Sequence, residues 1–281
     1  MVYNTTGASH GDAPTKRPKV RIPSLMAAKG KQKLSAITCY DATFARLIER
    51  TAIDIVLVGD SLGHVIQGLQ STIPVTCEDI CYHTRAVARA GLTAHLVADM
   101  PFGTAGLRDD RCFDAAVQIM QSGAESVKVE GSSPEILRQI GQLVRQGIPV
   151  MGHIGLTPQS VHTIGGYRIQ GKSKSDIEAL TESARALEDV GCYAIVLELC
   201  TDTAGKAVTE AVSIPTIGIG SGPDCDGQIL VLHDMLGMNA AFTPKFLKHY
   251  EKLEERITSA LNSYTSEVQT GVFPRKQNSD G

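Results

Sequence analysis

The 281-residue sequence is 42% hydrophobic and has a net charge of −3, so it can bury a sizeable core in one large domain or two small ones. The near balance of charge argues against a nucleic-acid footprint. An aromatic content of 5%, with no tryptophan, argues against a stacking platform for single-stranded nucleic acid.

The seven cysteines form no disulfide framework, because their number is odd and their spacing irregular. Cys77 and Cys81 lie one helical turn apart, but no second Cys/His pair completes a zinc site. We therefore interpret them as small thiols packed on a helix. Dispersed free cysteines are typical of a reducing cytosol. No apolar run is of signal-peptide type or long enough to span a bilayer, so we expect a soluble, cytoplasmic protein.

In chain order, residues 1–20 are polar and are expected to form a loose extension. Short apolar runs then alternate with amphipathic segments. The sequence predicts strands at 34–40, 53–59, 93–100, 126–130, 150–154, 193–199, 215–219 and 227–236. It predicts helices at 42–52, 77–90, 108–122, 133–146, 176–190 and 203–211, and a terminal amphipathic helix at 246–264. We expect a catalytic domain over 21–265 and a loose tail over 266–281.

The strand runs are apolar on both faces and alternate with helices about eight times. This pattern is typical of a parallel sheet covered by helices. A single-domain (β/α)8 TIM barrel fits the count and the length, and a doubly wound open sheet is the alternative. The barrel is favoured because polar groups recur at strand ends and would meet on one rim. These groups are Asp60, Asp99, Glu130, His153 and Glu198.

Three of these acids predict a divalent cation. Asp60, Asp99 and Glu130 would repel one another in one pocket, and oxygen ligands suit Mg²⁺ rather than zinc. Lys128 lies two residues before Glu130 and so faces the same interior, where a substrate anion would compensate its charge. Simpler explanations stay open. Each acid could cap a helix, Lys128 could form an internal ion pair, and His153 could be either a core residue or a catalyst.

Glu198 stands apart from these acids along the chain but on the same rim. A carboxylate facing a metal-bound substrate is well placed as a general base. The pattern thus indicates metal-assisted carbanion chemistry on a small oxo-acid. Two long glycine-containing loops, 60–75 and 155–172, could cover the site. The GIGSG motif at 218–222 is either a tight strand–helix turn or a phosphate cradle, and alone it is a weak signal.

Several motifs together resemble the ketopantoate hydroxymethyltransferase family (3-methyl-2-oxobutanoate hydroxymethyltransferase). They are VGDSLG, TIPVT, ADMPFG, VKVEG, GHIGLTPQS, GGYRIQG, GIGSGPDCDGQILVLHDMLG and VFP, in family order from about residue 35 to 274. The resemblance implies a TIM barrel, a homodecamer and a role in pantothenate biosynthesis. It implies one-carbon transfer from 5,10-methylenetetrahydrofolate to 3-methyl-2-oxobutanoate, giving 2-dehydropantoate and tetrahydrofolate. By motif position, the resemblance implies that Asp60 and Asp99 are Mg²⁺ ligands and that Glu130 is a further acid of the metal site. It implies that Glu198 is the proton acceptor. It also implies substrate-binding groups at Asp60, Ser61, Asp99 and Lys128.

The sequence departs from the family in two places. Leu199-Cys200-Thr201 follows Glu198 where a small turn with Val-Pro is common, and Ser221 replaces a more usual alanine. Two rival functions stay open. One is a Mg²⁺-dependent enzyme like isocitrate lyase or phosphoenolpyruvate mutase, and the other is a barrel that binds ligand without catalysis.

Overall fold

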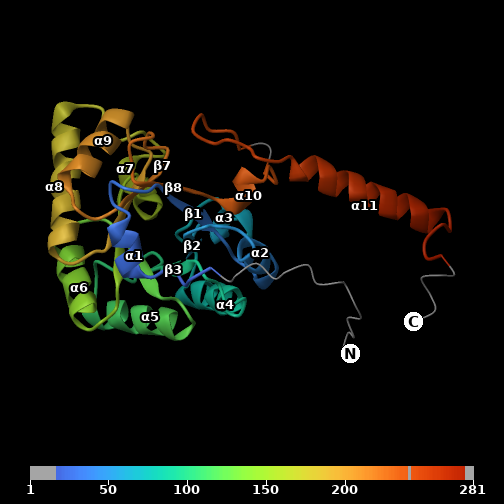
Figure 1. Cartoon of the computed structure of the whole chain (residues 1–281), viewed down its shortest axis with the longest axis horizontal. Helices are drawn as coiled ribbons and strands as arrows, with labels where there is room; N and C mark the ends of the chain where they lie inside the picture. The colour runs from blue at the N-terminus through green and yellow to red at the C-terminus, as the bar shows by residue number, and fades with distance from the viewer. Residues whose placement is uncertain (1–16, 240–241, 276–281) are drawn as a thin grey trace.

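The computed structural model describes residues 17–239 and 242–275, and Figure 1 shows a barrel body from which one long helix stands away. Eight strands close into a barrel in chain order, and every neighbouring pair is parallel. The predicted TIM barrel is therefore confirmed, and the open sheet is excluded. The strands are β1 Leu34–Thr38, β2 Ile55–Val58, β3 His95–Asp99, β4 Ser126–Glu130, β5 Val150–Gly155, β6 Ala194–Glu198, β7 Thr216–Ile219 and β8 Gly227–Leu230.

The helices cover the outside of the barrel. The described chain contains α1 Ile22–Ala27, α2 Ala42–Ile48, α3 Leu62–Val65, α4 Cys77–Ala88, α5 Asp109–Gln121, α6 Pro134–Arg145, η1 Pro158–Ser160, α7 Val161–Ile164, α8 Lys174–Asp189, α9 Asp202–Ala211, α10 Leu232–Met235 and α11 Leu253–Gln269. Capping residues in the sequence determine where several helices begin. The Asp41 carboxylate accepts from two backbone amides of α2, and Thr76 and Asp79 form a capping box on α4.

The core has two layers, because successive side chains of a strand point to opposite faces. Leu57, Val97 and Met151 fill the barrel interior, while Val56 and Ala98 pack outward against the helices. Helix α1 closes the N-terminal end of the barrel. Its Leu25 is 1% exposed and belongs to the interior cluster. The opposite end is therefore the open end, where the strands deliver their last residues.

The chain differs from the prediction after β8. We expected a strand over 227–236, but the strand stops at Leu230 and a short helix, α10, follows. The Leu232 amide donates to the Thr38 hydroxyl (3.1 Å) instead of continuing the ladder. A short apolar run does not distinguish a buried strand from a buried helix, which explains the error.

The terminal helix was also placed too early. It spans Leu253–Gln269 rather than 246–264, so residues 266–269 of the expected loose tail are helical. Residues 1–16 and 276–281 lie outside the described residues, so the loose ends remain predictions there. Lys19, which we placed in the N-terminal extension, contacts the barrel by donating to the carbonyls of Leu92 and Ala94. No helix of the described chain has both the length and the apolar character needed to cross a bilayer.

His95 provides a test of this barrel interior. It is 2% exposed, and its Nε2 lies 2.9 Å from the Ser126 hydroxyl. Burial lowers the pKa of His95 from 6.5 to about 4, although nearby Glu125 opposes the shift. Because the folded pKa lies below the unfolded one, neutral His95 stabilises the fold above pH 6.5. This contribution is lost as the pH falls from 6.5 towards 4.

We expect the wild type to lose about 2 kcal/mol more unfolding free energy than His95→Gln between pH 7.5 and pH 5. Urea unfolding at the two pH values measures the difference. Equal losses in the two proteins would show that His95 is not buried in its neutral form.

Candidate active site

The structure gathers the predicted rim residues at the C-terminal end of the barrel. Asp99 ends β3, Glu130 ends β4 and Glu198 ends β6, while Asp60 follows β2 directly after Gly59. The strand register places Glu130 opposite His153 on β5. This arrangement follows from parallel pairing, which brings the carboxyl ends of all the strands to one edge.

Lys128 lies inside this ring of acids. It is 5% exposed, and its Nζ is 3.0 Å from Asp99 Oδ1 and 3.2 Å from His153 Nδ1. Burial disfavours the charged ammonium, but Asp99, Glu130 and Asp60 outweigh it and raise the pKa of Lys128. The internal ion pair that we considered therefore exists, and Lys128 is a buried cation held among carboxylates.

The two aspartates are joined directly. The Asp60 amide donates to Asp99 Oδ2 (2.8 Å), and both side chains are almost fully buried. Burial raises the pKa of Asp60 well above its usual value, and the charges of Asp99 and Glu130 raise it further. Burial also raises the pKa of Asp99, although Lys128 opposes this. The site thus holds more negative charge than its own cations neutralise.

His153 links the acid group to Glu198. Its Nδ1 lies 3.3 Å from Glu130 Oε1, and its Nε2 lies 3.3 Å from Glu198 Oε2. Burial and Lys128 lower the pKa of His153, but the two glutamates outweigh them and raise it to about 9. Burial alone would raise the pKa of Glu130, but His153 brings it below the usual value. His153 is therefore part of the ionic network.

Gln159 is a site residue that sequence reasoning missed. Its side-chain amide donates to Asp60 Oδ2 (2.9 Å) and to the Met100 carbonyl (3.1 Å), and its backbone amide donates to Glu130 Oε2 (3.0 Å). One residue of the loop after β5 thus holds two acids that come from different strands. The only sequence signal was its place four residues after the end of β5, in GLTPQS.

The neighbourhood of Ser61 is built by residues distant in sequence. The Ser61 hydroxyl lies 2.8 Å from the hydroxyl of Tyr40, which follows β1 and is 1% exposed. The two long loops also meet. Tyr167 of the second loop places its hydroxyl 3.2 Å from His64 Nε2 of the first loop. The two loops therefore contact each other, and Gln159 of the second loop also contacts Asp60 of the first.

The donor set fits a hard cation. No three His, Cys, Asp or Glu side chains converge as a ready metal-binding group within residues 17–239 and 242–275. However, Asp99 Oδ1 and Glu130 Oε1 are buried carboxylate oxygens whose contacts are ion pairs, to Lys128 Nζ (3.0 Å) and His153 Nδ1 (3.3 Å). Mg²⁺ commonly uses one or two carboxylates and keeps several waters, so it does not require a complete protein cage. The arrangement of buried oxygens is compatible with such a site.

A substitution of Lys128 tests the charge balance. In Lys128→Met, the buried carboxylates lose their cation, which we expect to cost about 3 kcal/mol or more of unfolding free energy at pH 8 with chelator. The carboxylates then bind protons more tightly in the folded state. The variant's stability should therefore fall as the pH rises and recover towards pH 5.5.

The measurement is urea unfolding at both pH values, with and without Mg²⁺. Lys29→Met is the matched control, because Lys29 pairs with Asp226 (2.8 Å) at the closed end of the barrel. Mg²⁺ should restore stability to Lys128→Met and not to Lys29→Met. A Lys128→Met protein as stable as wild type at pH 8 with chelator would contradict the charge balance.

Comparison with known proteins identifies the family. The profile of the family described as ketopantoate hydroxymethyltransferase matches residues 19–276. The 3-methyl-2-oxobutanoate hydroxymethyltransferases of Anaeromyxobacter sp. (strain Fw109-5) and Thermotoga maritima are each 48% identical, covering 92% of this chain and 86% and 96% of their own lengths. A crystal structure of phosphonopyruvate hydrolase in complex with oxalate and Mg²⁺ shares the fold, with a TM-score of 0.58 at 13% identity and 92% coverage of both chains. The chain belongs to the ketopantoate hydroxymethyltransferase family.

Proposed function

We propose that the protein transfers a hydroxymethyl group from 5,10-methylenetetrahydrofolate to 3-methyl-2-oxobutanoate, forming 2-dehydropantoate and tetrahydrofolate. The observation that carries the proposal is the contrast among the rim acids. The side chains of Asp99 and Glu130 are 2% and 4% exposed, whereas that of Glu198 is 21% exposed. Buried acids are suited to hold charge, and an exposed one is suited to exchange protons with a substrate.

Binding of the oxo-acid is assigned to the buried end of the site. Lys128 is the cation there, so it is the natural partner for the substrate carboxylate. We assign further substrate contacts to Ser61, Asp60 and Asp99. Tyr40 fixes the position of the Ser61 hydroxyl, which leaves that hydroxyl oriented before the substrate arrives.

We propose Mg²⁺ as the cofactor, held by Asp60 and Asp99 with Glu130 as a further acid of the metal site. The charges support this assignment. Counted as ionised, four carboxylates against the two cations Lys128 and His153 give a charge of −2; the acids are Asp60, Asp99, Glu130 and Glu198. Burial opposes this charge by raising the pKa of Asp60 and Asp99. One divalent cation would cancel the charge and favour the ionised form of both aspartates. When bound, Mg²⁺ would supply positive charge that stabilises the negative charge developing on the keto oxygen. The fold relative with oxalate and Mg²⁺ supports the same choice.

Residues of the chain carry out the proton transfer. Glu198 takes the proton from C3 of the oxo-acid, and the electron pair of the C–H bond delocalises onto the keto oxygen. His153 lies between Glu198 and Glu130 and keeps the base oriented towards the site. The C3 carbon forms a bond to the one-carbon unit as the bond from that unit to one folate nitrogen breaks. One water then adds the hydroxyl oxygen as the bond to the second nitrogen breaks. The two nitrogens take up the proton removed from C3 and one proton of the water, which gives tetrahydrofolate. A cytoplasmic location fits the seven free cysteines and remains a prediction.

Glu198→Gln tests the assignment of the base. We expect the variant to lose at least about 100-fold in C3 proton exchange and in product formation, because its amide cannot accept the proton. The affinity for the oxo-acid with Mg²⁺ should change little. Exchange is followed by NMR in D₂O, and binding by calorimetry. Native exchange in a folded Glu198→Gln variant would refute the role of Glu198.

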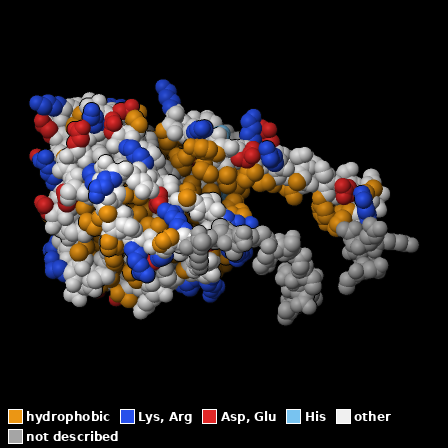
Figure 2. Space-filling model, viewed as in Figure 1, with side chains coloured by type: hydrophobic (Ala, Val, Ile, Leu, Met, Phe, Trp, Pro, Cys, Tyr) orange, Lys and Arg blue, Asp and Glu red, His pale blue; other side chains and the backbone are white. Residues whose placement is uncertain are grey.

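We also propose a homo-oligomer, with the homodecamer implied by the family resemblance. The support is α11, which stands away from the body and contains no buried residue (Figure 1). Ile257, Leu261, Tyr264 and Val268 are all exposed, and their spacing places them on one face of the helix. Figure 2 shows apolar side chains gathered along this helix and on the body beside its base. An unpartnered apolar face of this kind is typical of a contact surface.

Sedimentation measures the assembly directly. Ten copies of a 30.0 kDa chain give about 300 kDa. We expect a mass near this value for the wild type and a much smaller one for the Ile257→Glu/Leu261→Glu variant. Ser259→Glu/Ser266→Glu adds the same charge to the opposite face and should leave the mass unchanged. A monomeric wild type would contradict the proposal.

A further inference from the structure

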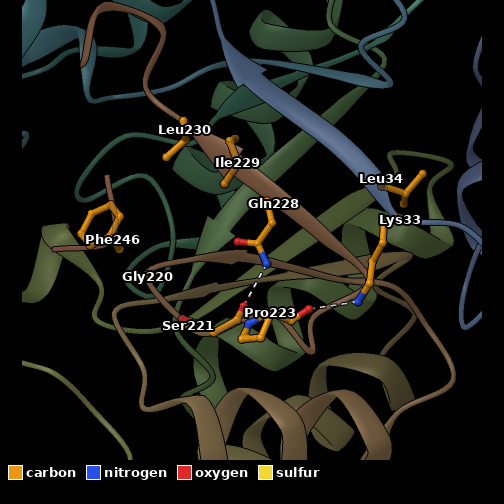
Figure 3. Close-up of a pocket in the computed structure, with 10 residues that line it drawn as sticks. Lys33, Leu34, Gly220, Ser221, Pro223, Gln228, Ile229, Leu230 and Phe246 are labelled. Atoms are coloured by element: carbon orange, nitrogen blue, oxygen red, sulfur yellow. Dashed lines mark hydrogen bonds between the residues drawn. The ribbon is translucent and has the colours of Figure 1, made fainter. Parts of the chain in front are cut away.

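The turn after β7 holds a buried hydroxyl whose role the sequence did not reveal. The segment 220–226 joins β7 to β8 without a helix, so GIGSG is not the strand–helix turn we considered. Ser221 lies between Gly220 and Gly222, both with positive φ, and is 0% exposed. Figure 3 shows this turn beside a cavity of ≈ 420 Å³ that Phe246 and Gln228 also line. None of the rim acids lines that cavity, and the turn follows β7, which pairs with β6, the strand that ends at Glu198.

The Ser221 hydroxyl bridges the two sides of Glu198. It donates to the Leu197 carbonyl (2.8 Å), one residue before Glu198, and accepts from the Cys200 amide (3.1 Å), two residues after it. The hydroxyl therefore restrains the backbone on both sides of Glu198, the proposed base. An alanine at position 221 could make neither bond, and the buried Cys200 amide would lose its acceptor.

The β5 side of Glu198 is equally restrained. The Glu198 carbonyl accepts from the Leu156 amide (2.8 Å). Gly155 makes this approach possible, because a Cβ there would lie 2.3 Å from the Glu198 carbonyl oxygen. The backbone of Glu198 is thus fixed between β5 on one side and the β7 turn on the other.

Leu199 shows that this restraint holds the chain in an unfavourable conformation. Its φ is +50°, in the left-handed region that a residue with a branched side chain rarely adopts. Its amide donates to the Ile219 carbonyl and its carbonyl accepts from the Gln170 amide, both at 2.8 Å. A residue in this region tends to relax to another conformation unless its surroundings prevent it. Relaxation at Leu199 would rotate the peptide that directly follows Glu198.

We infer that Ser221 is a positioning residue for the reaction: its hydroxyl locks the 197–200 turn and thereby holds the Glu198 carboxylate against His153 and towards the substrate. This inference rests on the proposed role of Glu198 as the base. Ser221 acts through Glu198 and touches no reacting atom.

Ser221→Ala is the main test, measured by C3 proton exchange in the Mg²⁺-loaded enzyme. We expect the exchange rate at saturating oxo-acid to fall about tenfold or more, because a small displacement of a catalytic group is costly. The KM for the oxo-acid should change less than threefold, since Lys128 and the metal acids are untouched. The pH profile of exchange should shift, because a displaced Glu198 carboxylate no longer stabilises the charged form of His153 to the same extent.

Two further variants separate positioning from general stability. Ser126→Ala removes another fully buried serine hydroxyl, at the closed end of the barrel. It should lower the melting temperature and leave the exchange rate and pH profile unchanged. Ser221→Cys fills the same space with a weak hydrogen-bonding group, so its exchange rate should lie between those of serine and alanine. This variant provides the test if Ser221→Ala does not fold.

A failure of the Ser221 inference can be distinguished from a failure of the proposed role of Glu198. Native exchange in a folded Ser221→Ala or Ser221→Cys protein overturns the inference, provided that Glu198→Gln is inactive. Equal kinetic losses in Ser126→Ala and Ser221→Ala also overturn it, because they would reflect stability alone. Native exchange in Glu198→Gln refutes the role of the base itself. Loss in Ser221→Ala with the intermediate rate in Ser221→Cys supports the positioning role.

Discussion

The ion pair between Lys128 and Asp99 is the interaction on which the rest of the site depends. Both side chains are almost fully buried at the open end of the barrel, where isolated charge is costly. Asp60 and Glu130 add negative charge that Lys128 alone does not balance. This excess is the basis on which we propose a divalent cation at the site, and that cation would in turn hold the anionic substrate. In this proposal, binding and folding are coupled through one set of charges.

The four acids of the site also differ in their surroundings, although they are chemically similar. Asp60, Asp99 and Glu130 are buried and held by Gln159 and Lys128. Glu198 is partly exposed and contacts the same network through His153. We propose that environment rather than residue type assigns charge binding to the three buried acids and proton transfer to Glu198. The turn that carries Ser221 completes this division, because it restrains the one acid that the buried cluster does not hold.

Much of this was predictable because a parallel barrel has simple rules. Apolar runs marked the strands, and the last residue of each run marked a rim position, which located Asp99, Glu130 and Glu198. Gln159 and Tyr40 escaped prediction because their roles depend on contacts between segments distant in the chain. The short helix α10 was missed because ILVLHDML is a short, mostly apolar run, interrupted by His233 and Asp234, and has no periodicity that distinguishes the two structures. The hydroxyl bridge of Ser221 depends on backbone angles that the sequence does not display.

The most direct test of the central claim is C3 proton exchange of 3-methyl-2-oxobutanoate by the wild-type protein in D₂O, followed by NMR with Mg²⁺ or with chelator and without folate. The account predicts exchange that requires Mg²⁺ and does not require folate. 2-Dehydropantoate should then form only after 5,10-methylenetetrahydrofolate is added. Absence of exchange in the folded, Mg²⁺-loaded protein would contradict the claim that this rim of acids removes a proton from the oxo-acid.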